Sequence, residues 1–421
     1  MTPGYTHLEK LFNDTYLIVD KGFLKLVCAT VIANRLPIDP VWLFLVAPSA
    51  GGKTSIIQAL DKVIGIYPIS TITANTFVSG FKKKGKETSL LHMIKDGIIT
   101  FKDFTSLLNL NQEERKQIMA QLREIYDGSY VKHFGTGDKI EWHGKIGMVA
   151  GVTTAIYVTR DLYASMGERF IMYAIALPDR KEMAKRSLQN VSIIQAQREK
   201  IKEAFRNYLD NEVAIPNEVP TIHADLENEI IELAEFSTRA RSVIEREWHS
   251  NTKDITFVHT PESPNRFASQ LKSIAMGFII MNGTKTLSEM DKNIIYKLAF
   301  DSINSTKRKA LQELGRYQTI NTAGLAIKMK YPTGTVRRWL EDLTVLEMAD
   351  RIKNSGKSDK WRIKDEYRAI VQRFDSIQTV DYDLDEKQAE DEEIQISSSP
   401  TAFIEQEEEN ASGVSDYGSF A

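Results

Sequence analysis

Apolar residues follow two different patterns along the first half of the chain. Between positions 5 and 35 they recur at helical spacing, which predicts helices that pack on a neighbouring core. Four later runs are short and almost continuously apolar, which predicts buried parallel strands at 41–46, 98–101, 146–150 and 171–177. The segment 68–73 is either a strand or an extended link. Helical segments separate these runs, so the pattern predicts an α/β fold with a parallel-sheet core.

The first predicted strand leads into a loop of small residues and then into an amphipathic helix that begins at about Lys53. This joint matches the P-loop motif G-x-x-x-x-G-K-[ST] except at the first position, where Ala47 replaces glycine. Backbone N–H groups of such a loop can converge on phosphate oxygens, Lys53 would reach the β- and γ-phosphates, and Thr54 would ligate Mg²⁺. The predicted ATP-binding residues are Ala47, Pro48, Ser49, Ala50, Gly51, Gly52, Lys53, Thr54 and Ser55. We expect Lys53 to be an exposed loop charge. The alternative is a chance Gly-Gly-Lys-Thr turn.

The predicted strand at 98–101 is followed closely by Asp103, a candidate ligand for Mg²⁺ beside the P-loop threonine. Nucleotide hydrolases usually place two acids here, one for the metal and one to orient water. This stretch offers only Asp103, and the sequence leaves open which of the two roles it takes. Glu124 and Asp127 are candidates for the second acid.

Three further features follow in chain order. Residues 131–142 predict a β-hairpin that carries Lys132 and His133. The predicted strand at 146–150 is followed by Thr153 and Thr154, whose hydroxyls would lie beside a nucleotide. The sequence Gly-Glu-Arg-Phe, with Arg169 as its arginine, comes directly before the last predicted strand.

This order of parts resembles the AAA+ ATPases, and within them the minichromosome-maintenance type and its relatives in phages and mobile elements. The resemblance implies a sensor role for Thr153 or Thr154, and an arginine finger at Arg169 that reaches the nucleotide of a neighbouring subunit. It also implies a ring-shaped homo-oligomer, a hexamer, whose hairpins line a DNA channel. Arg266 resembles the second AAA+ sensor, which touches the γ-phosphate. The alternatives are a surface salt bridge for Arg169 and a pair with Glu262 for Arg266.

Residues 304–366 have the pattern of a winged helix-turn-helix. The candidate recognition helix spans 335–346 and turns Arg337 and Arg338 partly outward, and the wing carries Lys353 and Lys357. Winged helices also mediate protein contacts, but these basic side chains favour DNA, contacted mainly through phosphates.

Charge divides the chain unevenly. The segment 375–421 holds fourteen acidic residues and one basic residue, a net charge of -13, so the remainder carries +10 against the total of -3. This composition predicts a disordered acidic tail, which either competes with DNA or binds a protein partner. The single cysteine, Cys28, excludes an internal disulfide framework, and no apolar run approaches the roughly 20 residues of a membrane span. We therefore expect a cytoplasmic protein without a membrane partner.

The sequence predicts five parts: N-terminal helices (1–36), an AAA+ core (37–178), a helical lid (179–303), a winged helix (304–366) and the acidic tail (375–421). The expected function is an ATP- and Mg²⁺-dependent DNA motor, a replicative helicase of a phage or mobile element. The alternative is a DNA-binding ATP switch, such as a helicase loader or a transcription regulator. The missing second acid favours the switch, whereas the hairpin and the arginine finger favour the motor.

Overall fold

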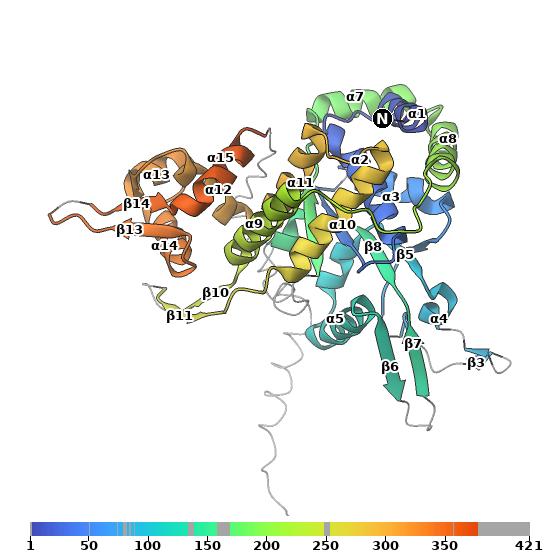
Figure 1. The fold of residues 1–421 in the computed structure, drawn as a ribbon, viewed down its shortest axis with the longest axis horizontal. Helices are drawn as coiled ribbons and strands as arrows, with labels where there is room; N and C mark the ends of the chain where they lie inside the picture. The colour runs from blue at the N-terminus through green and yellow to red at the C-terminus, as the bar shows by residue number, and fades with distance from the viewer. Residues whose placement is uncertain are drawn as a thin grey trace, which may run out of the picture. The chain divides into compact units, whose positions relative to one another are not determined.

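The predicted strands form one parallel sheet (Figure 1). The computed structural model describes residues 2–49, 51–73, 75–78, 82–83, 86–87, 89–133, 139–157, 169–247, 253–356 and 358–377. The five strands pair in parallel in the order β2-β5-β8-β1-β9. Their bounds are β1 (Trp42–Val46), β2 (Ile66–Ile69), β5 (Gly97–Phe101), β8 (Ile146–Val152) and β9 (Phe170–Ala174). The α/β fold with a parallel sheet is confirmed, and the uncertain segment 68–73 contributes only the end of β2.

The sheet is covered on both faces, which explains why its strands are so apolar. Every residue of β1, β8 and β9 is buried. Leu43 and Leu45 belong to the apolar cluster on the face of α2 (Lys21–Arg35) and α3 (Lys53–Ala59). Trp42 and Phe44 point the opposite way, and their rings contact Tyr126 and Phe104 at centroid distances of 5.1 and 4.8 Å. These partners belong to α5 (Gln112–Tyr126) and to the 3₁₀ helix η2 (Phe104–Asn109).

The helix α11 (Glu289–Asp301) covers the edge strand β9 with charged side chains. The Asp301 carboxylate accepts the main-chain N–H of Ala174 at 2.8 Å, and Lys297 donates to the Ala174 carbonyl at 2.6 Å. Asp301 also pairs with Lys297 and, at 2.6 Å, with Arg308. These buried groups provide the hydrogen bonds that a further strand would otherwise make at this edge.

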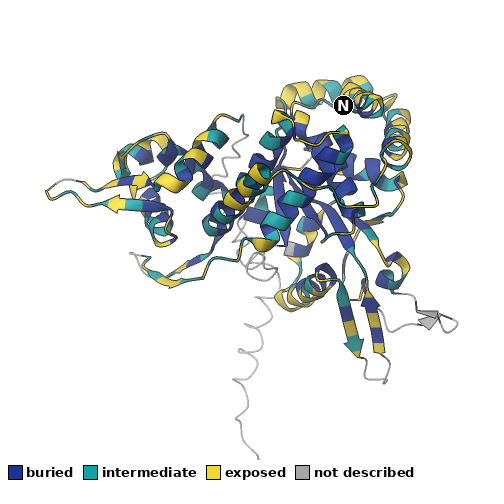
Figure 2. Cartoon of the chain, in the orientation of Figure 1, coloured by how far each residue is buried: buried dark blue, intermediate teal, exposed yellow. Residues whose placement is uncertain are grey.

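The other helices that precede residue 305 lie around the parallel sheet. The Asp20 carboxylate caps α2 and also accepts from the Tyr173 hydroxyl and from the main-chain N–H of Ala176, so it joins α2 to the end of β9. Helix α7 differs from α2 because none of its residues is buried (Figure 2). The remaining bounds are α1 (Pro3–Thr15), α4 (Leu90–Ile94), α7 (Arg180–Asn190), α8 (Ile194–Arg206), α9 (Ala224–Arg241) and α10 (Asn265–Asn282).

Residues 305–375 form helices and a three-stranded antiparallel sheet of order β12-β14-β13. Val336, Leu340 and Leu343 of α14 are buried as predicted, and the Trp361 indole donates to the Thr322 hydroxyl at 2.9 Å. The elements are α12 (Ser305–Gly315), β12 (Ile320–Asn321), α13 (Thr322–Met329), α14 (Thr333–Val345), β13 (Ala349–Ile352), β14 (Lys360–Ile363) and α15 (Asp365–Asp375).

Three two-stranded hairpins complete the described strands: β3 (Lys82–Lys83) with β4 (Lys86–Glu87), β6 (Ser129–His133) with β7 (Lys139–His143), and β10 (Ile244–Arg246) with β11 (Ile255–Val258). The hairpin expected at 131–142 is therefore present, although residues 134–138 lie outside the described part. None of the described helices is long and apolar enough to cross a membrane. The predicted domain boundaries stay predictions, and the acidic tail beyond residue 377 lies outside the described residues.

Candidate functional site

The P-loop sequence lies at the carboxyl end of β1, between the ends of both neighbouring strands. Ala47 N–H donates to the Val152 carbonyl at 3.2 Å, and Ile175 N–H donates to the Val46 carbonyl at 2.9 Å. The loop then turns into α3 at Gly52, which has φ +82°, a conformation that L side chains rarely adopt. The predicted strand–loop–helix context is therefore present. Ala50, one of the predicted phosphate-binding residues, lies outside the described part.

Lys53 is buried, so the expectation of an exposed loop charge is wrong. Its side chain curls back into the loop, where it donates to the Ala47 carbonyl and, at 2.8 Å, to the Pro48 carbonyl. Burial lowers the pKa of Lys53 to about 8, and the nearby Asp103 carboxylate opposes part of that change. Thr54, the next residue, is exposed at the first turn of α3.

The ends of β5 and β8 meet beside Lys53. A Cβ on Gly151 would lie 2.7 Å from the Lys102 carbonyl oxygen and 3.3 Å from Lys53 Cβ, so glycine allows these segments to approach closely. Asp103 is exposed, and Thr153 and Thr154 are half-buried. Thr105 links the segments that follow β5 and β8, because its hydroxyl accepts the Thr153 N–H at 2.8 Å. Sequence reasoning missed Thr105, since no motif marks it.

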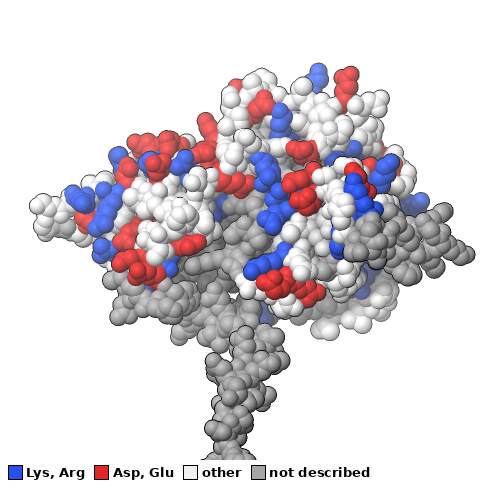
Figure 3. All heavy atoms as spheres, turned by 90° about the horizontal axis from the view of Figure 1, so that it is seen from below, with Lys and Arg blue, Asp and Glu red and all other residues white. Residues whose placement is uncertain are grey.

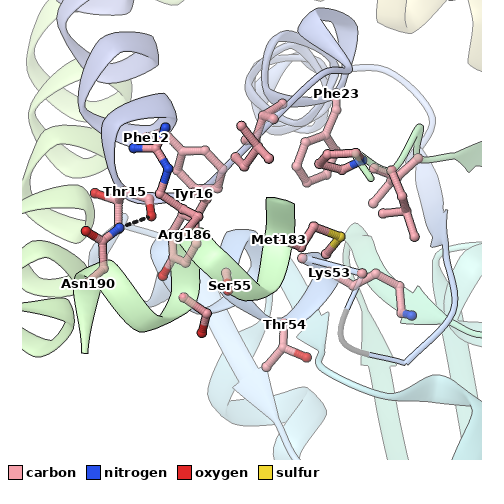
Figure 4. A pocket seen from close by; sticks show the side chains of 18 of the residues that line it. Phe12, Thr15, Tyr16, Phe23, Lys53, Thr54, Ser55, Met183, Arg186 and Asn190 are labelled. Atoms are coloured by element: carbon pink, nitrogen blue, oxygen red, sulfur yellow. Dashed lines mark hydrogen bonds between the residues drawn. The ribbon is translucent and has the colours of Figure 1, made fainter. Parts of the chain in front are cut away.

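A cavity of about 500 Å³ opens beside the loop (Figure 4). The end of α1 and the following residues form one wall, and α7 forms another. Arg186 of α7 donates to the Asp14 carbonyl at 3.1 Å, and Asn190 donates to the Thr15 carbonyl at 2.8 Å. The volume is typical of small-ligand sites. The apolar lining includes Phe12, Tyr16, Leu17, Ile18, Phe23, Ile175, Leu177, Met183, Val191 and Ile194, and the polar lining includes Gly51, Gly52, Lys53, Thr54, Ser55, Arg186 and Arg198.

The structure does not bring Arg169 and Arg266 to this cavity. Arg169 directly precedes β9, whose first residue pairs with Trp42 at the start of β1, whereas the P-loop lies about 16 Å further along the strand at ~3.3 Å per residue. The guanidinium groups of Arg169 and Arg266 lie 5.6 and 5.9 Å from the centroid of the Tyr126 ring. The two predicted arginines therefore share the amino end of the sheet.

Both arginines at this end are paired with acids of their own chain. Arg169 is buried and forms a two-point ion pair with Asp127, at 2.7 and 3.3 Å. Arg266 pairs with Glu262 at 3.3 Å, which is the alternative that the sequence left open. Asp127 therefore lies far from the P-loop and does not supply a second acid there. Asp103 is the only acid in the described segment 102–110 after β5.

The described residues contain no group of three or more His, Cys, Asp or Glu side chains that could hold a metal ion. Mg²⁺ usually keeps several waters and binds through one or two protein oxygens together with substrate phosphates. The exposed Thr54 hydroxyl and Asp103 carboxylate suit Mg²⁺ binding of this kind. Any metal here would depend on a bound polyphosphate.

The residues predicted to contact DNA on the β6–β7 hairpin fall on opposite faces. Lys132 is half-buried and pairs across the strands with Ile140, a buried residue, whereas His133 is exposed opposite Lys139. Successive strand residues alternate in direction, so Lys132 and His133 cannot point the same way. The exposed face also carries Glu141, which pairs with Lys139 and His143. Sequence reasoning missed Lys139 and His143.

Helix α14 carries the other predicted DNA contacts. Arg337 is exposed and pairs with Glu341, and Arg338 donates to the Thr335 hydroxyl at 3.0 Å. Lys353, on the wing, is exposed, and Lys357 lies outside the described residues. Arg246 of the β10–β11 hairpin forms an ion pair at 2.6 Å with Asp342, an acidic residue in the second half of α14. Figure 3 shows basic and acidic side chains interspersed over the face that it presents.

Comparison with known proteins identifies no family. No protein-family model matches the chain, and a search of curated proteins found no significant match. The function must therefore be inferred from the site itself.

Proposed function

We propose that this protein is an ATPase that works as an oligomeric DNA motor, most simply a replicative helicase of a phage or mobile element. The observation that carries the proposal is the convergence of three strand ends on Lys53. The P-loop follows β1, Asp103 follows β5, and Thr153 follows β8, which lies between the other two strands. This arrangement agrees with the AAA+ resemblance, because it would put an acid and a hydroxyl beside the phosphates of a bound nucleotide.

The residues around the cavity have the chemistry to bind ATP. The apolar walls suit a base, and the loop N–H groups with the start of α3 suit the phosphates. The Lys53 ammonium now bonded to the Ala47 and Pro48 carbonyls would turn to the β- and γ-phosphates. Mg²⁺, when bound with ATP through Thr54 and Asp103, would neutralise charge on the transferring phosphoryl group.

The positions of Arg169 and Arg266 support an oligomeric motor. Both lie at the end of the sheet opposite their own P-loop, so they can reach a nucleotide only in a neighbouring subunit. Subunits that contact head to tail in this way form a ring when the rotation between them closes. DNA would then contact the exposed face of the β6–β7 hairpin and the basic residues of α14 and the wing.

A second candidate is a DNA-binding ATP switch, a loader or transcription regulator that does not unwind DNA. It is favoured by the single acid after β5, because fast hydrolysis generally needs both a metal ligand and a group that orients water.

Strand displacement separates the two candidates. The full-length protein is incubated with ATP, Mg²⁺ and a forked duplex that carries a labelled strand. The motor releases the labelled strand only when ATP is hydrolysed, whereas the switch binds the fork and releases nothing. A non-hydrolysable ATP analogue is the control, since it should support binding without release in either case.

The pKa of Lys53 leads to a prediction about pH. In the free protein this pKa is about 8, and bound phosphates stabilise the charged form, so they raise it. Binding above pH 8 then takes up a proton, and affinity should fall by up to about tenfold per pH unit until the pKa of the complex is reached. Calorimetry between pH 7 and 9.5 measures this change. The dependence should be absent in Lys53→Ala, and a flat profile in the wild-type protein would contradict the role of Lys53.

Replacing Arg337 and Lys353 with glutamine should weaken duplex DNA binding. Each phosphate contact adds about 0.9 to the log–log salt slope, so loss of two contacts should reduce the slope by about 1.8. The exposed Arg337–Glu341 pair is no obstacle, since such pairs are weak. Arg316→Gln is a matched control because Arg316 lies at the end of α12, outside α14 and the wing. Unchanged affinity and slope in the double variant would exclude this surface.

A further inference from the structure

Thr105 joins the ends of β5 and β8 in the candidate site. Its main-chain N–H donates to Asp103 Oδ1 at 3.0 Å, while its hydroxyl accepts the main-chain N–H of Thr153 at 2.8 Å. A single threonine thus holds both the acid of one strand end and the polar residue of the next. These are the two groups proposed to face the nucleotide from that side.

We propose that Thr105 is a positioning residue for ATP hydrolysis, which sets the distance between the Asp103 carboxylate and Thr153. The inference rests on the proposed function. Asp103 is exposed and is the only acid in segment 102–110. No other side chain in that segment can therefore replace the Asp103 carboxylate if it is displaced. The bond from Thr105 N–H occupies Oδ1 and leaves Oδ2 to face Mg²⁺ or the attacking water. Small misplacements of such groups cost large factors in rate.

The hydroxyl of Thr105 has a role that few other side chains could take. It accepts the main-chain N–H of Thr153, a half-buried residue at the end of β8. Valine has the same shape but no acceptor, and serine keeps the acceptor. Ser106, the next hydroxyl, donates to the Asp103 carbonyl at 2.9 Å, within its own segment. The link between the strand ends therefore depends on Thr105.

The test compares Thr105→Val with Thr105→Ser in steady-state ATP hydrolysis by the full-length protein. We expect Thr105→Val to lower kcat about tenfold, the effect of one lost hydrogen bond, with KM and ATP affinity within about twofold of wild type. Thr105→Ser should keep kcat within about twofold. Thr30→Val is the matched control, because the Thr30 hydroxyl bonds only to Leu26 within α2, away from the site. If the valine variant does not fold, Thr105→Ala removes the same acceptor.

A double-mutant cycle with Asp103→Asn separates positioning from general stability. If Thr105 acts through Asp103, the double variant should be no slower than Asp103→Asn alone, whereas independent effects multiply. Equal kcat for Thr105→Val and wild type, or multiplicative effects, would overturn the inference and leave the proposed ATPase intact. A wild-type protein that neither binds nor hydrolyses ATP would instead overturn the proposed function, and the inference with it.

Discussion

Lys53→Ala is expected to fold normally and to lose ATP turnover by at least about a hundredfold, the usual scale for removing one essential charge-stabilising donor. Lys53 is buried, but among the described residues its ammonium bonds only to carbonyls of its own loop, and burial already disfavours its charge. Removing it should therefore cost little stability, and the melting temperature should stay within about 3 °C of wild type. The γ-phosphate would lose its cation, and the transition state would lose that stabilisation.

Turnover is measured by phosphate release, together with circular dichroism to verify folding. Lys62→Ala is the matched control, since Lys62 follows α3 closely and pairs with the exposed Glu199 and Glu203. This control should hydrolyse ATP at the wild-type rate. Normal turnover by a folded Lys53→Ala protein would mean that the P-loop sequence is not a nucleotide site.

Arg169→Ala should bind ATP with unchanged affinity and hydrolyse it about a thousandfold more slowly, the lower end of the range for arginine fingers. The reason is positional, because Arg169 lies at the amino end of the sheet and its own P-loop lies at the carboxyl end. An arginine there can neutralise phosphoryl charge only in a neighbouring subunit. Its ion pair with Asp127 must then open when subunits assemble.

Two experiments distinguish this role from a structural one. Asp127→Asn removes the same ion pair but keeps Arg169, so a purely structural pair predicts similar losses for both variants, whereas a finger predicts that only Arg169→Ala loses turnover. Mixing Arg169→Ala with Lys53→Ala should also restore part of the activity, since a mixed assembly can pair an intact P-loop with an intact Arg169. The absence of any rescue in assemblies that exchange subunits would exclude action on a neighbour.

Local pattern alone was enough to predict four of the five strands of the parallel sheet and the P-loop joint. The apolar runs at 41–46 and 146–150 are short and rich in β-branched or aromatic residues, which favours strands buried on both faces, and β1 and β8 lie there. Gly52 and Lys53 likewise mark where the loop ends and the helix starts, because glycine adopts the positive φ that the turn needs. Burial patterning also identified the inward residues of α14. These features depend on neighbours in sequence, so the sequence specifies them directly.

Tertiary structure decided which residues from distant parts of the sequence lie beside one another. Residues of α1 and α7, more than 160 positions apart, form the two walls of one cavity, and no motif indicates that they meet. Arg266 lies with Arg169 and not with the P-loop, because α10 contacts Tyr126 at the other end of the sheet. The burial of Lys53 and the bond from Thr153 to Thr105 arise in the same way. Strand order and helix packing determine such contacts, and they depend on which apolar faces pack together across the whole fold.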